Sequence, residues 1–345
     1  MYTPPSQSED EHGRLHHMQI EYSAQLHELD QNAFFCILHE SKLNALSNSL
    51  EGESVIGITV GAPLLLSDLF LGLLSHPAFV PDIGASTDEC APFDQYNLPT
   101  IGGRYGLASV RLPRFIPISQ TRRGYAALLT DLALDFLFLH EMGHLVAGHI
   151  PYLQMLRGSH SAITAFDYPI AEPPDDALTD HAIEFDADWF AMKLLIPLCL
   201  RDEILLASFK GMGEASRFRF RSLILAIILC ILVGGRDSPT VDECLSERQH
   251  PHPYWRILLL EYCGLQAIHH NLPGAEEIWT GAFRQALKDI ATVRNLLTEA
   301  ESFFAEILTV GPIINDHHSR LLDRHQRLID QLKENDLDKR QSWIS

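Results

Sequence analysis

One stretch of the chain, residues 136–149 with the sequence FLFLHEMGHLVAGH, constrains the fold more than any other. It places the pattern HExxH, formed by His140, Glu141 and His144, inside a strongly apolar run. Such a run predicts a buried helix, and residues four apart lie on one face of a helix. Polar side chains buried without partners are costly, so a metal ion held by both histidines is the simplest explanation of the pattern.

Two histidine ligands need a third ligand, and His149 and Glu184 are the residues to compare. His149 is one residue short of the third histidine of HExxHxxGxxH, and on a continuous helix it lies about 140° round from His144. Glu184, in the sequence EFDAD, is predicted on a second helix, where Ala187 allows close packing. Asp188 shares its face and can accept a hydrogen bond from a ligand histidine. We predict Glu184 as the third ligand; the alternative is that Glu184 and Asp188 belong to a solvated acidic face.

The HExxH and ExxAD patterns, with Glu184 forty residues after His144, resemble the gluzincin arrangement of the HtpX and CAAX-prenyl-endopeptidase family. Upstream, Asn32 begins a segment, NAFF, that looks like the NAF segment of that family. Downstream, His250-Pro251 followed by Arg256 resembles its HP(x)4R element. The phage-exclusion peptidases of the Lit type, which also carry HExxH, are similar in kind.

This resemblance implies a zincin-like fold and a Zn²⁺-dependent endopeptidase that hydrolyses a protein or peptide substrate. Glu141 is then the general base that activates water, and Asn32 and His250 are nominated as catalytic residues that stabilise the oxyanion. Arg256 is expected to orient the site. The HP element is doubled here, so His252 competes with His250 for this role. The alternatives are that Asn32 is a turn residue and His250 a surface histidine.

Composition narrows the class of protein. The chain has 345 residues and a formal net charge of -19, which argues against nucleic acid as a partner because phosphate binding needs clustered Lys and Arg. The N-terminal residues lack the pattern of a secretory signal, and the six cysteines lack CxxC spacing, so we expect reduced thiols and a cytoplasmic location. The longest apolar run, Leu223–Val233, has about half of the roughly 20 residues that span a bilayer. We expect a buried helix there and no integral membrane insertion; contact with a membrane surface through the preceding arginines is the alternative.

The predicted fold is α+β and mostly helical, with a zincin-like core made of a small N-terminal sheet, an HExxH helix and a second, ExxAD helix. The predicted domains are a disordered lead-in at 1–17, a metallopeptidase domain at 18–270 and a C-terminal helical extension at 271–345. Strands are predicted at 18–26, 32–39, 55–60 and 105–112, with a loop at 81–100. Helices are predicted at 63–74, 122–148, 175–195, 200–209, 217–232, 254–268, 274–308 and 316–334, the second beginning at an N-cap of Thr121 and ended by Pro151.

Two other functions fit the same sequence. The first is a regulatory, phage-exclusion or stress-response metalloprotein of zincin fold with very narrow or no proteolytic activity. The second is a helical structural protein in which HExxH is accidental. Metal content separates the second from the others, and peptide cleavage compared with a Glu141→Gln variant separates an enzyme from a regulator.

Overall fold

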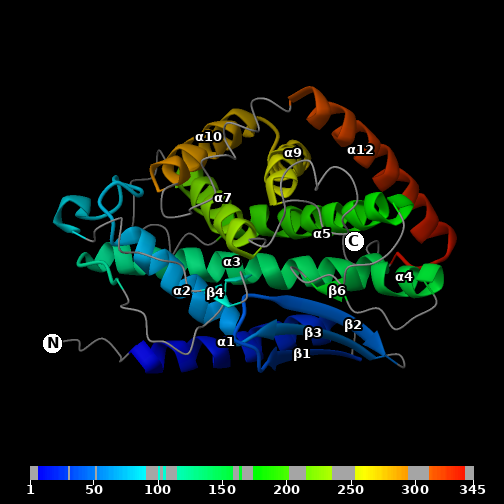
Figure 1. The fold of residues 1–345 in the computed structure, drawn as a ribbon, viewed down its shortest axis with the longest axis horizontal. Coiled ribbons are helices and arrows are strands. Elements are labelled where there is room, and N and C mark those ends of the chain that lie inside the picture. Colours follow the sequence, from blue (N-terminus) through cyan, green and yellow to red (C-terminus); the bar gives the residue numbers. More distant parts are fainter. Residues whose placement is uncertain are drawn as a thin grey trace.

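Helices make up most of the described chain, and a small sheet lies near its N-terminal end (Figure 1). The computed structural model describes residues 7–29, 32–50, 53–90, 100–101, 104–105, 115–157, 163–164, 174–201, 215–234, 253–293 and 311–338. The α+β, mostly helical class predicted from the sequence is therefore confirmed.

The strands are β1 (Ala33–Leu38), β2 (Ala45–Leu50), β3 (Glu53–Thr59), β4 (Thr100–Ile101), β5 (Arg104–Tyr105) and β6 (Ile163–Thr164). The helices are α1 (Gln7–Leu29), α2 (Gly61–Leu74), the short 3₁₀ turn η1 (Ser86–Asp88), α3 (Gln120–Ala147), α4 (His149–Arg157), α5 (Pro174–Arg201), α7 (Ala215–Gly234), α9 (Pro253–Asn271), α10 (Glu276–Thr292) and α12 (Gly311–Glu334).

The main sheet has the strand order β1-β3-β2-β6. Strand β3 pairs with β1 in parallel and with β2 in antiparallel orientation, and β2 also pairs with β6. Central strand β3 carries the β-branched residues Ile56 and Ile58, both fully buried, which suits a pleated surface covered by other elements. Helix α3 packs on β2 and β3, so the sheet supports the helix that carries HExxH (Figure 1).

Helix α1 packs against β1 and corrects two predictions. The strand predicted at 18–26 is wrong, because these residues are helical, as are residues 7–17 of the expected disordered lead-in. The buried residues Met18, Tyr22 and Leu26 are four apart, which is the spacing of one helix face. The Tyr22 ring stacks on Phe138 of α3, with ring centroids 4.0 Å apart, and so connects α1 to the HExxH helix.

The ends of α3 differ in detail from the prediction. Its N-cap is Ser119 rather than Thr121, and the Glu89 carboxylate accepts hydrogen bonds from the backbone N–H groups of Ile118 and Ser119. At the other end, Gly148 takes the left-handed conformation, with φ of 76°, and terminates the helix. The prediction that Pro151 ends the helix is wrong. Pro151 lies in the first turn of α4, where its missing N–H costs nothing.

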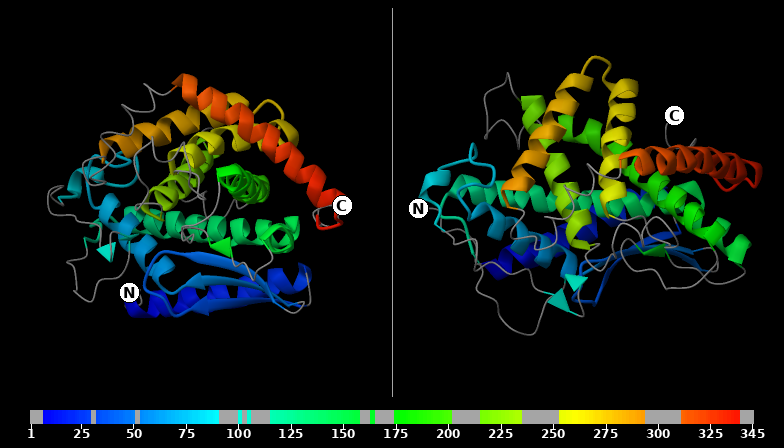
Figure 2. Two further views of the ribbon diagram at one scale, coloured as in Figure 1. Left: turned by 45° about the vertical axis from the view of Figure 1, so that its right-hand side comes forward. Right: turned by 45° about the horizontal axis from the view of Figure 1, so that its top comes forward.

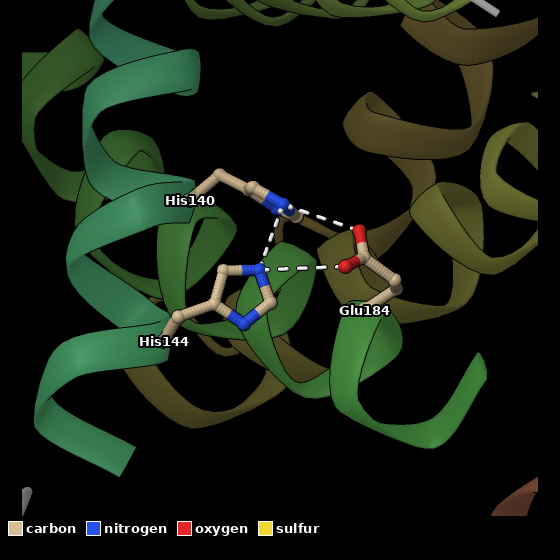
Figure 3. Close-up of side chains that lie close together, drawn as sticks. All are labelled: His140, His144 and Glu184. Carbon is tan, nitrogen blue, oxygen red and sulfur yellow. Dashed lines mark hydrogen bonds and ion pairs between the residues drawn. The ribbon is translucent and has the colours of Figure 1, made fainter. Parts of the chain in front are cut away.

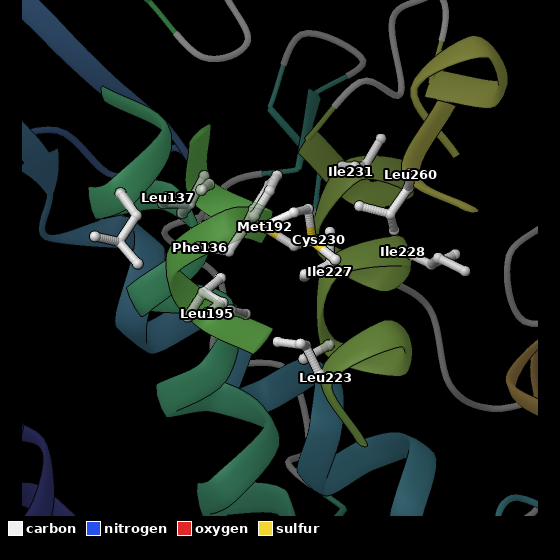
Figure 4. Close-up of a cluster of buried hydrophobic side chains, with 14 of the residues drawn as sticks. Phe136, Leu137, Met192, Leu195, Leu223, Ile227, Ile228, Cys230, Ile231 and Leu260 are labelled. Atoms are coloured by element: carbon white, nitrogen blue, oxygen red, sulfur yellow. The ribbon is translucent and has the colours of Figure 1, made fainter. Parts of the chain in front are cut away.

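Helix α7 contains the apolar run 223–233 and lies inside the protein. It packs against α3, α5, α9 and α10, so apolar residues are needed all round it. Figure 4 shows side chains of this run meeting Phe136 of α3, Met192 of α5 and Leu260 of α9. The predicted buried helix is confirmed. Among the described residues, none of the helices combines the length and the apolar character needed to cross a bilayer.

Helices α10 and α12 lie in the predicted C-terminal extension, and both contribute to the same hydrophobic core as the rest of the chain. Trp279 and Phe283 of α10 are buried, and α10 packs against α7. Helix α12 lies alongside α5 and buries Leu321, Leu328 and Leu332 (Figure 2). The extension is therefore integrated into the main core.

The sequence did not predict β2 or β6, whereas the predicted strand at 32–39 matches β1 and that at 55–60 overlaps β3. The predicted helix at 200–209 and most of the predicted strand at 105–112 lie outside the described residues, as does the part of the predicted helix 274–308 beyond residue 293. The described cysteines are free thiols, and Cys199, Cys230 and Cys263 are buried.

The buried guanidinium of Arg122 organises the segment that follows α2. It donates five hydrogen bonds of 2.6–3.0 Å to backbone carbonyls, those of Leu74, His76, Phe79, Val80 and Ile83. Loss of the guanidinium would leave these buried carbonyls without hydrogen bonds. The free-energy cost of leaving a buried polar group without a partner is larger than the net stabilisation that a hydrogen bond gives.

We expect Arg122→Met to lower the free energy of unfolding by about 3 kcal/mol or more, because it strands several buried carbonyls at once. Denaturation by guanidinium chloride measures this change. The control is Arg123→Met at the neighbouring exposed position, where a change within about 0.5 kcal/mol is expected. Equal effects of the two substitutions would contradict the role of Arg122.

Candidate metal centre

His140 and His144 lie one turn apart on α3 and point toward Glu184 of α5 (Figure 3). All three side chains are fully buried. The Nε2 atoms of the two histidines are 3.2 Å apart. Glu184 Oε2 lies 3.3 Å from His140 Nε2, and Glu184 Oε1 lies 3.5 Å from His144 Nε2. This group of three side chains can hold a metal ion, with its ligand atoms within 4.8 Å of one another.

A close crossing of α3 and α5 brings the three side chains together. A Cβ atom at Gly143 would lie 3.1 Å from the Cα of Ala187 and 3.2 Å from the Cβ of Phe190. The close packing predicted from Ala187 is confirmed, and Gly143 is the small residue that faces it on α3. Because Gly143 lies between the two histidines, the same crossing brings Glu184 against both.

The three separations fit one small ion. Two ligand atoms about 2.1 Å from a tetrahedral zinc ion lie about 3.4 Å apart. The distances of 3.2, 3.3 and 3.5 Å between the Nε2 and carboxylate oxygen atoms are close to this edge length. Two imidazole nitrogens and a carboxylate also form the ligand set of one class of catalytic zinc site. The donor geometry and the donor types therefore both suit zinc.

Protonation of the two histidines differs in the absence of metal. Burial lowers the pKa of His140, but the carboxylates of Asp188 and Glu184 outweigh burial and raise it to about 9. Burial holds the pKa of His144 well below its ordinary value. A metal ion must therefore displace a proton from His140, and its affinity is expected to fall as the pH falls.

Asp188 and Arg256 support His140 from behind. His140 Nδ1 lies 2.9 Å from Asp188 Oδ1 and donates to it, which leaves Nε2 free to bind a metal. Arg256 donates from Nε and Nη2 to the two oxygens of Asp188, at 2.9 and 2.7 Å. The hydrogen bond predicted from the ExxAD spacing is confirmed, and Arg256 is connected to the site through Asp188.

We expect Asp188→Asn to lower zinc affinity by about 10–100-fold, because the substitution removes the negative charge that fixes the His140 proton. Competition with a chromogenic chelator measures this affinity. Asp289→Asn is the matched control, because Asp289 pairs with Arg221 at 2.6 Å in a second buried carboxylate–guanidinium contact. The prediction fails if both variants bind zinc as tightly as the wild type.

Glu141 is buried beside the two histidines, and neither of its carboxylate oxygens has a hydrogen-bond partner among the described residues. Burial raises the pKa of Glu141 to about 8. The Ser47 hydroxyl of β2 lies close enough to oppose this rise, although not in hydrogen-bonding geometry. Ser47 was missed in the sequence because the ALSNSL segment has no strong strand signal.

The balance of buried charge also favours a divalent cation. When Glu141 is ionised, Glu141, Glu184 and Asp188 carry three negative charges, and Arg256 carries one positive charge. A divalent ion held by His140, His144 and Glu184 offsets the excess negative charge of these groups. Buried charges need such compensation, because an isolated charge is strongly disfavoured away from water.

His149 is outside the group of ligands, as predicted, but for a different reason. The helix does not continue to it, because Gly148 ends α3 and redirects the chain. His149 Nδ1 lies 3.0 Å from His144 Nδ1, behind the metal-facing side of the His144 ring. The sequence analysis assigned no role to His149, nor to its neighbour Asp186.

Asn32 lies in an exposed turn before the edge strand β1. Ser47, which lies beside Glu141, is on β2, two strands away from β1 in the sheet. Ser47 pairs with Ile56, and Ile56 pairs with Phe35. With the usual spacings of a sheet, this register puts the Cα atoms of Asn32 and Ser47 about 14 Å apart. The catalytic role of Asn32 stays a prediction, and this separation does not favour it. His250 and its competitor His252 lie outside the described residues.

Comparisons of the chain with models of protein families, with curated proteins and with solved structures found no match.

Proposed function

We propose that this protein is a zinc-dependent peptidase of the gluzincin type, with His140, His144 and Glu184 as zinc ligands and Glu141 as the general base. The observation that carries the proposal is the position of Glu141. It lies next to a convergent set of three ligand atoms, and its carboxylate is buried without a hydrogen-bond partner among the described residues. A structural metal site needs no such carboxylate, whereas a hydrolytic site does.

The residues have distinct tasks in hydrolysis. A bound zinc ion would supply a Lewis acid that polarises a carbonyl group and makes water acidic enough to ionise near neutral pH. Glu141 takes the proton of the attacking water on a carboxylate oxygen and later gives it to the nitrogen of the leaving amine. Burial raises the pKa of Glu141 to about 8 without metal, and a bound cation would lower it and keep the carboxylate ionised as a base.

Access to the site is a part of the proposed function. His140, Glu141, His144 and Glu184 have no exposed surface. A peptide can therefore reach them only when part of the surrounding chain moves. This favours a peptidase with a narrow range of substrates over a general one.

The proposal is tested by comparing new protein termini in cells that express the wild type with those in cells that express Glu141→Gln. Termini that appear only with the wild type support peptidase activity and identify the substrate. If the purified wild type contains zinc but produces no such termini, a regulatory metalloprotein becomes the better explanation. If it contains no bound metal, the HExxH pattern has no role in metal binding.

A further inference from the structure

A chain of buried hydrogen bonds runs from His144 to the C-terminal helix α12. His144 Nδ1 lies 3.0 Å from His149 Nδ1, and His149 Nε2 lies 3.1 Å from Asp186 Oδ2. The other oxygen of Asp186, Oδ1, lies 2.7 Å from Nε2 of His325. The four residues come from α3, α4, α5 and α12, and each is buried.

The hydrogen bonds allow only one arrangement of protons when His144 binds a metal. Nε2 of His144 faces Glu184, so it carries the lone pair for the metal and Nδ1 carries the proton. Nδ1–H then donates to Nδ1 of His149, whose own proton is placed on Nε2 and donates to Asp186. His325 donates from Nε2 to the second oxygen of Asp186. Each ring therefore has one defined tautomer.

We infer that His149, Asp186 and His325 are positioning residues for the ligand His144, and that α12 is in this way part of the metal centre. The inference rests on the metal-binding half of the proposed function. A ligand histidine whose second nitrogen is hydrogen-bonded has a fixed ring orientation and a more basic metal-binding nitrogen. The two ligands then have separate supports from α5: Asp188 contacts His140 directly, and Asp186 supports His144 through His149.

Helix α12 is held in place by contacts that do not involve His325. Arg324 donates from Nη2 to the Thr179 hydroxyl at 2.7 Å, and Tyr152 of α4 donates to Gln331 at 2.6 Å. The backbone of Leu337, just after α12, lies against Gly148 at the end of α3. Removal of the His325 hydrogen bond should therefore leave α12 docked, so its effect on the metal can be measured in a folded protein.

The test uses two substitutions of His325 in the full chain. The His325 ring packs against Phe185 and Trp189, with centroid distances of 4.8 and 5.9 Å. His325→Phe keeps an aromatic ring but loses the donor to Asp186, whereas His325→Gln keeps a donor and loses the ring. We expect zinc affinity to be about tenfold lower in His325→Phe than in the wild type. In His325→Gln, most of this loss should be absent. A purely packing role for the ring predicts the opposite order.

A matched control is available on the same helix. His318 lies seven residues before His325, and its ring packs against Tyr262 at a centroid distance of 5.4 Å. His318→Phe should leave zinc affinity unchanged. The visible absorption of the cobalt-substituted protein is the second readout, because it should change in His325→Phe and Asp186→Asn but not in His318→Phe.

The outcomes separate this inference from the proposed peptidase function, because neither measurement requires a substrate. If the wild type binds zinc and His325→Phe binds it equally tightly with an unchanged cobalt spectrum, the inference is wrong and the metal centre stands. If the wild type binds no zinc, both are wrong. If His325→Phe weakens binding while no peptide is cleaved, the inference stands without the peptidase.

Discussion

Glu141→Gln is expected to lower kcat/KM for peptide hydrolysis by about a thousandfold or more, with zinc content unchanged. The glutamine side chain has nearly the same shape as glutamate but cannot accept a proton from water. Glu141 lies beside the three ligand atoms and is not one of them, so metal binding should survive. Kinetics on a cleavable peptide, together with elemental analysis of the same samples, measure both quantities.

A second acid on α3, the partly buried Asp135, provides the control for this substitution. Burial raises the pKa of Asp135 to about 6, and its carboxylate accepts a hydrogen bond from the Tyr22 hydroxyl at 2.8 Å. Asp135→Asn is the same change of acid to amide on the same helix, and we expect it to leave hydrolysis intact. Turnover by Glu141→Gln at the wild-type rate would exclude Glu141 as the general base.

Glu184→Ala is expected to weaken zinc binding by much more than 100-fold. Substitution of a residue that only supports a ligand typically lowers metal affinity by about 10–100-fold. The substitution removes one of three ligands together with the only negative charge among them. The comparison variant is His149→Ala, which removes a support of His144 and should stay within that range. Metal content after dialysis, followed by competition with chelators of graded affinity, distinguishes the two variants.

The order of these two effects decides the ligand assignment. If His149→Ala empties the site and Glu184→Ala retains zinc, then His149 is the ligand. Circular dichroism of both metal-free variants serves as the check on folding. Both residues are fully buried, so a loss of zinc counts only when the helical content is preserved.

Local spacing explains why much of the site was predictable. His140 and His144 are four residues apart, as are Glu184 and Asp188, and each pair needs only a helix to share one face. The apolar residues around HExxH predicted a buried helix, and Ala187 predicted close packing of the second helix. These features depend on the residues of single helices, so the sequence contains them.

The secondary-structure predictions from the sequence failed at residues 18–26 and at β2, where the local pattern was ambiguous or weak. Residues 18–26 were predicted as a strand because a short segment can fit both periods, whereas the spacing of Met18, Tyr22 and Leu26 follows the helix. Strand β2 was missed because ALSNSL has no β-branched or aromatic residue. It is a strand because β3 and β6 pair with its two edges, and such pairing is a property of the assembled sheet.

The sequence alone determined the helical class, the two helices that carry the candidate ligands and the residues of the candidate ligand set. Only the tertiary structure placed Ser47 beside Glu141, connected Asp188 to Arg256 and linked His144 through His149 and Asp186 to His325. Spacing within one helix fixes which residues share a face, because helix geometry is regular. Contacts between residues of different elements, 37 to 139 positions apart in these hydrogen bonds, depend on how whole elements pack, and no local pattern encodes that arrangement.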